Sequence, residues 1–533
     1  MNDKINLITT PVFYANGQPH LGNIYTIVLA DIFKKYLYLH NINSFLVTGL
    51  DEHGQKIEKG NLEALKNIEQ YLRDLRLQYK QILKWLAIDY DYFVYTSSDQ
   101  HKQYVTKQID LLYHREFIYH DEYEGYYSIQ DETFLTPREV IFKNNQYFSI
   151  KDKYRVERIK ESAYFLKTKQ FFPYIKKTLK IPSTLQPKQK VKEMLNIIAD
   201  KEFSNLCISR SSLDVRGIEL PFDKKNKLYV WVDALYSYYS ALDYCFDKKI
   251  KFKQVNSFHI IGKEITKFHS IYLPIIMKMS DIKVASFSLY SHQWILIKGE
   301  KMSKSKGNII SALKLRKMLK TDELRYYLFK NGPVQNDALL SITDAHELIR
   351  TDLINKYGNL CYRTTRMIKN YNIDVWGNFE IKKLLVNHAK FVKIINSILS
   401  QVFHARNKKK LIHLFNNLHA IRKKVIELID MGNSLLSIAE PWNLFKKNRE
   451  EQGEQILFLG LLFIIIFSFL IRPVITDTTK KVFKSLNLNF TQIKYIWNKS
   501  KNEEEFIRKV GSLIKGMCGA KKITPIKIFN KGE

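Results

Sequence analysis

Two short polar signatures stand far apart in the chain, and each contains residue types that bind a triphosphate. The first is PHLGN, which contains His20 and Asn23, and the second is KMSKS, which contains Lys301 and Lys304. Imidazole and amide groups donate hydrogen bonds to phosphate oxygens, and lysines add positive charge. We predict that the two signatures meet around one nucleotide, which requires a binding site assembled from distant parts of the sequence.

The residues around PHLGN predict how this signature is positioned. The alternating run of Ile5, Leu7 and Thr9 is typical of a strand, and a helical pattern extends from Gly22 to about Leu39. The signature therefore lies where a strand becomes a helix, so free backbone N–H groups and the positive end of the helix dipole would point at a phosphate. KMSKS is followed by a glycine and predicts a cationic loop that closes over the departing phosphates.

Either signature alone is weak, because a histidine after a strand is often a hydrogen-bonded loop residue and a lysine cluster is often a solvated surface. Other nucleotide-binding patterns fit less well. Gly17 and Gly22 have the outer spacing of a phosphate-binding loop, but Asn23 occupies the position of its lysine. The sequence also lacks the GxG core of a dinucleotide-binding fingerprint.

Matches to one family run through most of the chain. They are PVFYANGQPHLGN (11–23), TGLDEHGQKI (48–57), GYYSIQDETFLT (125–136), ISRSSLD (208–214), YVWVDAL (229–235), IIGKEITKFHSIYLP (260–274), DLINKYGNLCYR (352–363) and AEPW (439–442). Together with KMSKS, these segments resemble the methionyl-tRNA synthetases, which are class I aminoacyl-tRNA synthetases. The related leucine, isoleucine and valine enzymes carry a large editing insertion, and the stretch between Arg115 and Lys227 is too short to hold one beside a connective module.

The resemblance implies a two-step reaction. L-Methionine would first react with ATP, accompanied by Mg²⁺, to give methionyl-adenylate, and the acyl group would then pass to the 3′ end of tRNA(Met). The expected catalytic residues are His20, Asn23, Lys301 and Lys304, which would position and stabilise phosphate charge without acting as nucleophile or base. The expected ATP-binding residues are His20, Asn23, Lys301, Met302, Ser303, Lys304 and Ser305.

The methionine pocket implied by the resemblance needs a carboxylate for the ammonium group and an apolar wall for the thioether, which packs well against aromatic edges. It would consist of Val12, Tyr14, Asp51, Trp231, Ala234, Tyr238, Ile265 and His269. The pattern alone favours another interpretation of Trp231 and Tyr238, because the segment YVWVDALYSYY is strand-like and such residues are usually ordinary core. Asp233, in the same segment, would support the pocket or the amino group, or serve as a structural cap.

Three positions depart from the family pattern. Asn23 replaces the second histidine of the usual HIGH spelling, Glu264 stands where aspartate is usual, and Leu273 stands where an aromatic residue often closes the pocket. An amide still donates a hydrogen bond, although it carries no charge. The other two departures bear on selectivity against small analogues.

Asn359, Arg363 and Trp442 match the positions that read the CAU anticodon in the family. Single-stranded bases stack on an indole and expose polar edges, so these residue types suit that role. Taken singly they are unremarkable, an Asn and an Arg one helical turn apart and a Trp after Pro at a helix start.

The 85 basic and 53 acidic residues give a formal charge of +32, which suits a tRNA partner, although AT-biased coding also enriches lysine.

Composition also bears on metals and compartment. The four cysteines, Cys207, Cys245, Cys361 and Cys518, are scattered and none lies in a CxxC pair, so we expect no structural zinc and a reduced, cytoplasmic setting. The start, MNDKINLITT, does not have a cationic segment followed by an apolar one, so a secretory signal is not expected.

The apolar run from Ile456 to Ile471 has 16 residues. A membrane span needs roughly 20 residues, so we predict a buried helix and no membrane association.

The predicted fold class is α/β, with a Rossmann-like catalytic domain split by a connective insertion and followed by an all-α anticodon-binding bundle. The expected parts are residues 1–114, the first half of the catalytic domain; 115–228, the insertion without a zinc knuckle; 229–350, the second half with KMSKS; 351–490, the bundle; and 491–533, a tail that folds back on the body, its last residues as a terminal strand on the catalytic domain. A monomer is expected, because no C-terminal dimerisation domain is appended.

Two rival functions belong to other classes. A nucleotidyltransferase with an HxGH-type site also joins an acid to a nucleotide, but it needs neither the helical bundle nor a KMSKS-like loop at this distance. A catalytically silent tRNA-binding paralogue would lose its phosphate-binding residues first. His20 and the whole of KMSKS are present here, which favours the enzyme.

Overall fold

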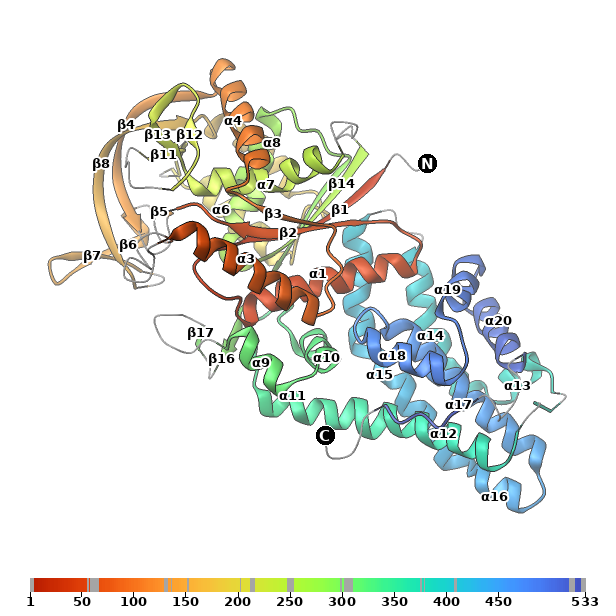
Figure 1. Ribbon diagram of the computed structural model, residues 1–533. Coiled ribbons are helices and arrows are strands. Elements are labelled where there is room, and N and C mark those ends of the chain that lie inside the picture. Colours follow the sequence, from red (N-terminus) through yellow and green to blue (C-terminus); the bar gives the residue numbers. More distant parts are fainter. Residues whose placement is uncertain are drawn as a thin grey trace.

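The computed structural model describes most of the chain, in several separate parts. They are residues 4–54, 57, 67–128, 133–135, 137–150, 153–201, 203–210, 216–246, 254–297, 300–301, 310–373, 376–377, 379–406, 410–516 and 523–528. The predicted α/β class with a following helical bundle is confirmed, as Figure 1 shows.

A six-stranded parallel sheet forms the centre of the N-terminal half, in the order β3-β2-β1-β14-β15-β9. Strand β14 is buried along its whole length, as expected for a parallel strand that is covered on both faces. The strand order reverses between β1 and β14. The strands are β1 (Ile5–Tyr14), β2 (Phe45–Asp51), β3 (Tyr92–Tyr95), β9 (Leu185–Gln186), β14 (Val255–Gly262) and β15 (Ser286–His292).

Helices cover both faces of this sheet. Helix α1 (Leu21–Leu39) packs on one face and lies between the sheet and the helical bundle (Figure 1). Helix α7 (Val230–Cys245) packs on the other face, in a second hydrophobic cluster with α4 (Asp99–His114) and α8 (Leu273–Met279). A π-helical segment, Phe268–Tyr272, leads into α8.

The strand-like interpretation of YVWVDALYSYY is wrong, because this segment forms most of α7. Residues from Val232 to Leu242 are buried on every side of the helix. A helix that is surrounded by other elements needs no polar face, so it loses the periodicity that distinguishes helix from strand. Aromatic residues favour strands only weakly, and the tertiary environment overrides that preference here.

The predicted insertion contains antiparallel strands, which curve away from the central sheet (Figure 1). They are β4 (Ile118–Ser128), β5 (Thr133–Leu135), β6 (Val140–Lys143), β7 (Gln146–Ser149), β8 (Arg155–Leu166), β10 (Leu206–Cys207), β11 (Ser209–Arg210), β12 (Glu219–Leu220) and β13 (Asp223–Leu228). The insertion is not wholly separate, because β9 pairs with β15 and forms an edge of the central sheet. Two helices flank β9 in sequence, α5 (Phe172–Leu179) and α6 (Gln189–Ala199).

Further helices and strands precede the bundle in sequence. They are α3 (Ile68–Trp85), β16 (Ile295–Ile297), β17 (Glu300–Lys301), α9 (Ala312–Met318), α10 (Thr321–Asn331), β18 (Ala338–Leu339) and α11 (Ile342–Leu348). Strands β16, β17 and β18 among them form a small separate sheet. Helix α11 continues through a π-helical segment, Ile349–Gly358, into α12 (Asn359–Asn370). The long helix that opens the bundle therefore begins before residue 351.

The bundle then consists of α13 (Ile381–Asn387), α14 (Ala389–Arg406), α15 (Leu411–Ala439), α16 (Pro441–Lys446), α17 (Glu450–Ile471), α18 (Thr476–Ser485), α19 (Phe490–Lys499) and α20 (Glu503–Lys515). Helix α17 is long and apolar enough to cross a membrane, but 89% of its most apolar window is buried inside the protein. Helices α12, α15, α18 and α20 pack against it. The prediction of a buried helix at this position is confirmed.

The tail differs from the expected terminal strand. Residues 523–528 form no strand, and two of their backbone N–H groups donate to the bundle, that of Ile526 to Thr365 Oγ1 at 3.1 Å and that of Thr524 to the Ser485 carbonyl at 3.3 Å. This short segment therefore lies against α12 and α18.

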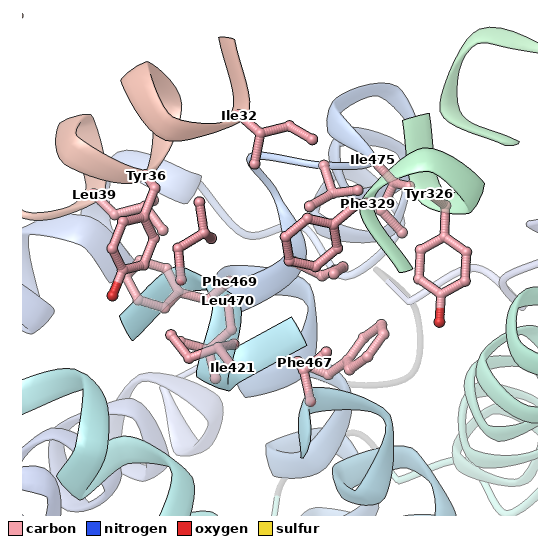
Figure 2. Packing of buried hydrophobic residues seen from close by; sticks show 14 of the residues in the cluster. Ile32, Tyr36, Leu39, Tyr326, Phe329, Ile421, Phe467, Phe469, Leu470 and Ile475 are labelled. Atoms are coloured by element: carbon pink, nitrogen blue, oxygen red, sulfur yellow. The ribbon is translucent and has the colours of Figure 1, made fainter. Parts of the chain in front are cut away.

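One hydrophobic cluster runs without a break from α1 into the bundle. Figure 2 shows residues from α1, α10, α15 and α17 meeting there, among them Tyr36, Phe329 and Phe469. A buried arginine lies at the same junction. Arg325 Nη2 is 2.6 Å from Asp31 Oδ2, and its guanidinium also donates to the carbonyls of Leu86, Pro473 and Val474. Packing and this network together join the bundle to the sheet.

Candidate active site

A cavity of about 380 Å³ lies beyond the carboxyl ends of the parallel strands. Tyr14 ends β1, Asp51 ends β2, Gly262 ends β14 and His292 ends β15, and all four line the cavity. The strand order reverses between β1 and β14, and open α/β sheets bind ligands at such a switch point. Sheet topology therefore selects this cavity as the candidate site.

The predicted methionine residues come together here. Val12, Tyr14, Asp51, Trp231, Ala234, Tyr238, Ile265 and His269 all line this cavity, as do His20 and Asn23. The structure thus brings the predicted methionine residues and two of the predicted ATP-binding residues into one site. Their roles toward a ligand stay predictions.

His20 and Asn23 hold the start of α1 in a reciprocal cap. His20 Nδ1 accepts from the backbone N–H of Gly22 at 3.1 Å, and the Asn23 side-chain oxygen accepts from the backbone N–H of His20 at 3.1 Å. Because Nδ1 is the acceptor, a neutral His20 ring carries its proton on Nε2 and is a hydrogen-bond donor there. The amide of Asn23 uses its oxygen in the cap, which leaves its NH₂ group as the end that can donate to a phosphate.

Residues shortly after KMSKS lie beside PHLGN. Lys301 lies in β17, and this strand pairs with β16. At the other end of the loop, Ser311 forms a bridge with His20, and the Leu21 N–H donates to the Ile310 carbonyl at 3.2 Å. Met302, Ser303, Lys304 and Ser305 lie outside the described residues, as does the Lys301 side chain. The described residues that follow the loop, Ile310 and Ser311, therefore lie next to the start of α1.

The apolar wall of the cavity is aromatic and uncharged. Trp231 stacks on Phe268 with the ring centroids 4.4 Å apart, and the buried indole Nε1 has no hydrogen-bond partner among the described residues. His269 Nδ1 donates to the Ile265 carbonyl at 3.1 Å, so its Nε2 accepts from the Tyr238 hydroxyl at 2.6 Å. Burial lowers the pKa of His269 to about 4, so this ring is neutral at pH 7.

Asp51 is the buried carboxylate of the cavity. Its Oδ1 accepts from the Thr96 hydroxyl at 3.2 Å and from the His53 backbone N–H at 3.3 Å. Both bonds orient the carboxylate at the end of β2. Cationic and hydrogen-bonding groups stabilise a buried carboxylate, and an ammonium group is one group of this kind.

Several lining residues were not predicted from the sequence. Thr26 and His292 are hydrogen bonded at 2.7 Å, and Gln293 and Trp294 follow His292 into the cavity. Burial lowers the pKa of His292. His292 ends the buried strand β15, and Gln293 and Trp294 follow it toward KMSKS, a position that could have drawn attention to these three residues if the strand order had been known.

Two of the family departures have different structural consequences. Glu264 lines the cavity, and its Oε2 accepts from Trp294 Nε1 at 2.8 Å. Its carboxylate lies close to Gly262, where a Cβ would be 2.6 Å from Oε1, so a larger residue at 262 would require the Glu264 side chain to move. Leu273 is fully buried in the cluster around α8 and is not among the residues that line the cavity.

The predicted anticodon residues lie on α12 and α16, and α16 is at the end of the bundle that is remote from the central sheet (Figure 1). Asn359 is exposed at the start of α12, and Arg363 lies one turn later with its guanidinium 5.6 Å above the Trp442 ring. Glu440, in a left-handed conformation with φ 43°, ends α15, and Pro441 begins α16. This sharp turn places Trp442 against α12.

The cysteines bear on the zinc prediction. Cys207 and Cys361 are buried, Cys245 is partly buried, and all three are free thiols. We expect the purified protein to contain no stoichiometric zinc, and chelation should leave its circular dichroism unchanged, because a structural zinc site requires several such ligands at one point. Elemental analysis tests this. About one tightly held zinc ion per chain would contradict the prediction.

Comparison with known proteins agrees with this geometry. A family model described as "tRNA synthetases class I (M)" matches residues 6–147 and 142–365, and one described as "Anticodon binding domain of methionyl tRNA ligase" matches residues 401–513. Methionine-tRNA ligase 1 of Bacillus anthracis is 32% identical over 501 residues, which cover 91% of this chain and 74% of that protein. The methionine-tRNA ligase of Ureaplasma parvum is 29% identical over 496 residues, 92% of this chain and 93% of that protein.

A solved structure, Mycobacterium tuberculosis methionyl-tRNA synthetase in complex with methionyl-adenylate, has the same fold. It superposes with a TM-score of 0.86 at 23% identity and covers 99% of this chain and 100% of that chain. The two family models between them span the sheet, the cavity and most of the bundle. The chain belongs to the methionine-tRNA ligase family of class I tRNA synthetases.

Proposed function

We propose that this protein activates L-methionine with ATP and transfers the methionyl group to tRNA(Met). Membership of the family indicates the class of reaction, and one structural observation supports where in the protein this reaction takes place. The phosphate signature, the buried carboxylate and the aromatic wall line a single cavity at the switch point of the sheet. A nucleotide and an amino acid bound there would have their reacting ends close together.

In the first step, a methionine carboxylate oxygen forms a bond to the α-phosphorus of ATP, and the bond from that phosphorus to the pyrophosphate oxygen breaks. Negative charge grows on the leaving pyrophosphate. The Nε2–H of His20, the amide of Asn23 and the positive end of α1 are donors for this charge. Lys301 and Lys304 would add positive charge from the KMSKS side.

Methionine would lie with its ammonium group at Asp51 and its thioether at Trp231, Tyr238 and His269. A neutral, aromatic wall suits a sulfur atom that is polarizable and accepts hydrogen bonds weakly. The buried Trp231 Nε1–H lacks a partner among the described residues and can donate to a ligand acceptor. Val12, Tyr14, Ala234 and Ile265 would complete the pocket.

Mg²⁺ would enter with ATP as the counter-ion of the triphosphate. Oxygen ligands suit this ion, and the oxygen-bearing side chains of Glu264 and Gln293 line the same cavity as His20, so the residues present fit a magnesium-bound nucleotide. When bound, the ion would offset repulsion between phosphate oxygens. In the second step, a hydroxyl of the terminal tRNA ribose attacks the methionyl carbonyl and AMP departs.

The direct test is exchange of labelled pyrophosphate into ATP. The purified protein should catalyse this exchange only when L-methionine is present, because exchange requires reversible formation of the adenylate. Charging of tRNA(Met) with labelled methionine tests the second step. An absence of methionine-dependent exchange in folded protein would contradict the proposal and would favour the catalytically silent tRNA-binding protein.

Recognition of the anticodon by Asn359, Arg363 and Trp442 is part of the proposal. Trp442→Ala should reduce tRNA charging about 10- to 100-fold, because loss of a base-stacking ring costs roughly 1 to 3 kcal/mol. Methionine-dependent pyrophosphate exchange should stay near the parent rate, since the cavity lies in the other half of the protein. Kinetics of both reactions check this prediction.

Trp442→Phe is the matched control, because it keeps an aromatic ring on the same turn and should recover most of the charging. Added salt should weaken tRNA binding by the parent and by both variants alike, since contacts with phosphates are unchanged. If Trp442→Ala charges tRNA as well as the parent, then Trp442 is a packing residue.

We also propose that the protein is a monomer and is located in the cytoplasm. Size-exclusion chromatography tests the oligomeric state, and cell fractionation tests the location.

A further inference from the structure

A buried carboxylate lies behind the cavity, between two histidines from other elements. Asp233 Oδ2 is 2.5 Å from His53 Nδ1, and Asp233 Oδ1 is 2.6 Å from His101 Nε2. On its other side, His101 Nδ1 is 2.7 Å from the Ser240 hydroxyl oxygen. The three side chains of His53, Asp233 and His101 are at most 3% exposed. We call these three residues the triad.

The triad connects three parts of the fold. His53 follows the end of β2, Asp233 is in the first turns of α7, and His101 is in α4. Burial alone would raise the pKa of Asp233, but the charges and hydrogen bonds of His53 and His101 lower it to about 2. The carboxylate therefore stays ionised and accepts from both rings, which joins the end of β2 to the start of α7.

None of the three residues is among those that line the cavity, so the triad does not touch a ligand there. Its neighbours in sequence do line it. Asp51 lies two residues before His53 and accepts from the His53 backbone N–H, while Trp231 and Ala234 flank Asp233 on α7. The triad thus fixes the carboxylate of Asp51 relative to the wall at Trp231.

We infer that His53, Asp233 and His101 are positioning residues that set the separation between the ammonium site at Asp51 and the wall at Trp231 and Ala234, and thereby the length of amino-acid side chain that is activated. This inference rests on the proposed function. Moving either end by a fraction of an ångström changes the fit of a single methylene group. One methylene in an apolar pocket changes kcat/KM by about 10- to 200-fold, so the effect is measurable.

The experiment uses Asp233→Asn and pyrophosphate exchange with three amino acids: L-methionine, L-ethionine, which is one methylene longer, and S-methyl-L-cysteine, which is one shorter. The side-chain amide of this variant has a single oxygen, so it can accept a hydrogen bond from only one of the two histidines. We expect the KM for methionine to rise about 10-fold, the KM for ATP to stay within about 2-fold, and the preference for methionine over at least one homologue to fall about 10-fold.

Asp322→Asn is the matched control, because Asp322 is another buried carboxylate, bonded to the Thr478 N–H at 2.6 Å at the contact between α10 and α18. It should lower thermal stability without changing the preference among the three amino acids. If Asp233→Asn does not fold, Ser240→Ala removes only the hydroxyl on the far side of His101 and should shift the preference in the same direction by a smaller factor.

The outcomes separate the two proposals. If the parent protein shows no methionine-dependent exchange, the proposed function fails. If the parent exchanges normally and Asp233→Asn, or Ser240→Ala in its place, keeps the parent preference among the three amino acids, the triad is a packing feature and the inference is wrong. A loss of thermal stability without a change in the preference among the three amino acids would also contradict the inference.

Discussion

His20→Ala should slow adenylate formation by about 10²- to 10³-fold, because removing one donor from a site of developing charge typically has this effect. Its Nδ1 caps α1, so the Nε2–H is the end of the ring that can serve the phosphates. The interaction should be stronger in the transition state than with bound ATP, and the loss should therefore appear mainly in the single-turnover rate. Rapid-quench measurement of adenylate formation checks this.

His20→Ser separates capping from catalysis. Serine is a good N-cap and should recover the roughly 1 kcal/mol of stability that alanine loses, but its side chain is too short to replace the ring in the cavity. If the serine variant recovers the rate together with the stability, His20 acts only as a cap. Asn23→Asp offers a second comparison, because it keeps the oxygen that caps His20 and adds negative charge where ATP phosphates are expected.

Arg325→Met should lower the free energy of unfolding by about 3 to 5 kcal/mol, which is the usual effect of removing one member of a buried ion pair. The change leaves the Asp31 carboxylate without its fully buried partner and leaves the carbonyls of Leu86, Pro473 and Val474 without that donor. Arg325 and Asp31 are both 0% exposed, so water cannot replace these bonds in the folded state. Urea unfolding followed by circular dichroism measures the effect.

The control for Arg325 is an ion pair on the surface. Lys356 Nζ is 3.0 Å from Asp430 Oδ1, and both side chains are partly exposed, so Lys356→Met should cost less than about 1 kcal/mol. Similar losses for the two variants would contradict a structural role for the buried network at the junction. A loss confined to Arg325→Met would support that role.

Part of the candidate site was predictable from the sequence because its residues lie in short contiguous segments. His20 and Asn23 follow a predicted strand, and local pattern is sufficient to place them where this strand gives way to a helix. The buried helix at this position was also predictable, since the run of 16 apolar residues from Ile456 to Ile471 is shorter than the roughly 20 that a membrane span needs. Family resemblance added the residues whose own patterns are ordinary, such as Trp231 and Tyr238.

Tertiary structure decided what depends on contacts between distant segments. The pairing of β1 with β14 and of β14 with β15 brings Thr26, His292 and Gln293 to the cavity, and no local pattern encodes that strand order. Burial of α7 on all sides removed the periodicity that would have identified it as a helix. The family, the α/β class and the two phosphate signatures follow from the sequence alone, since these depend on residue type and order. Strand order, the contact of Glu264 with Trp294 and the buried triad depend on long-range packing, which only the folded chain defines.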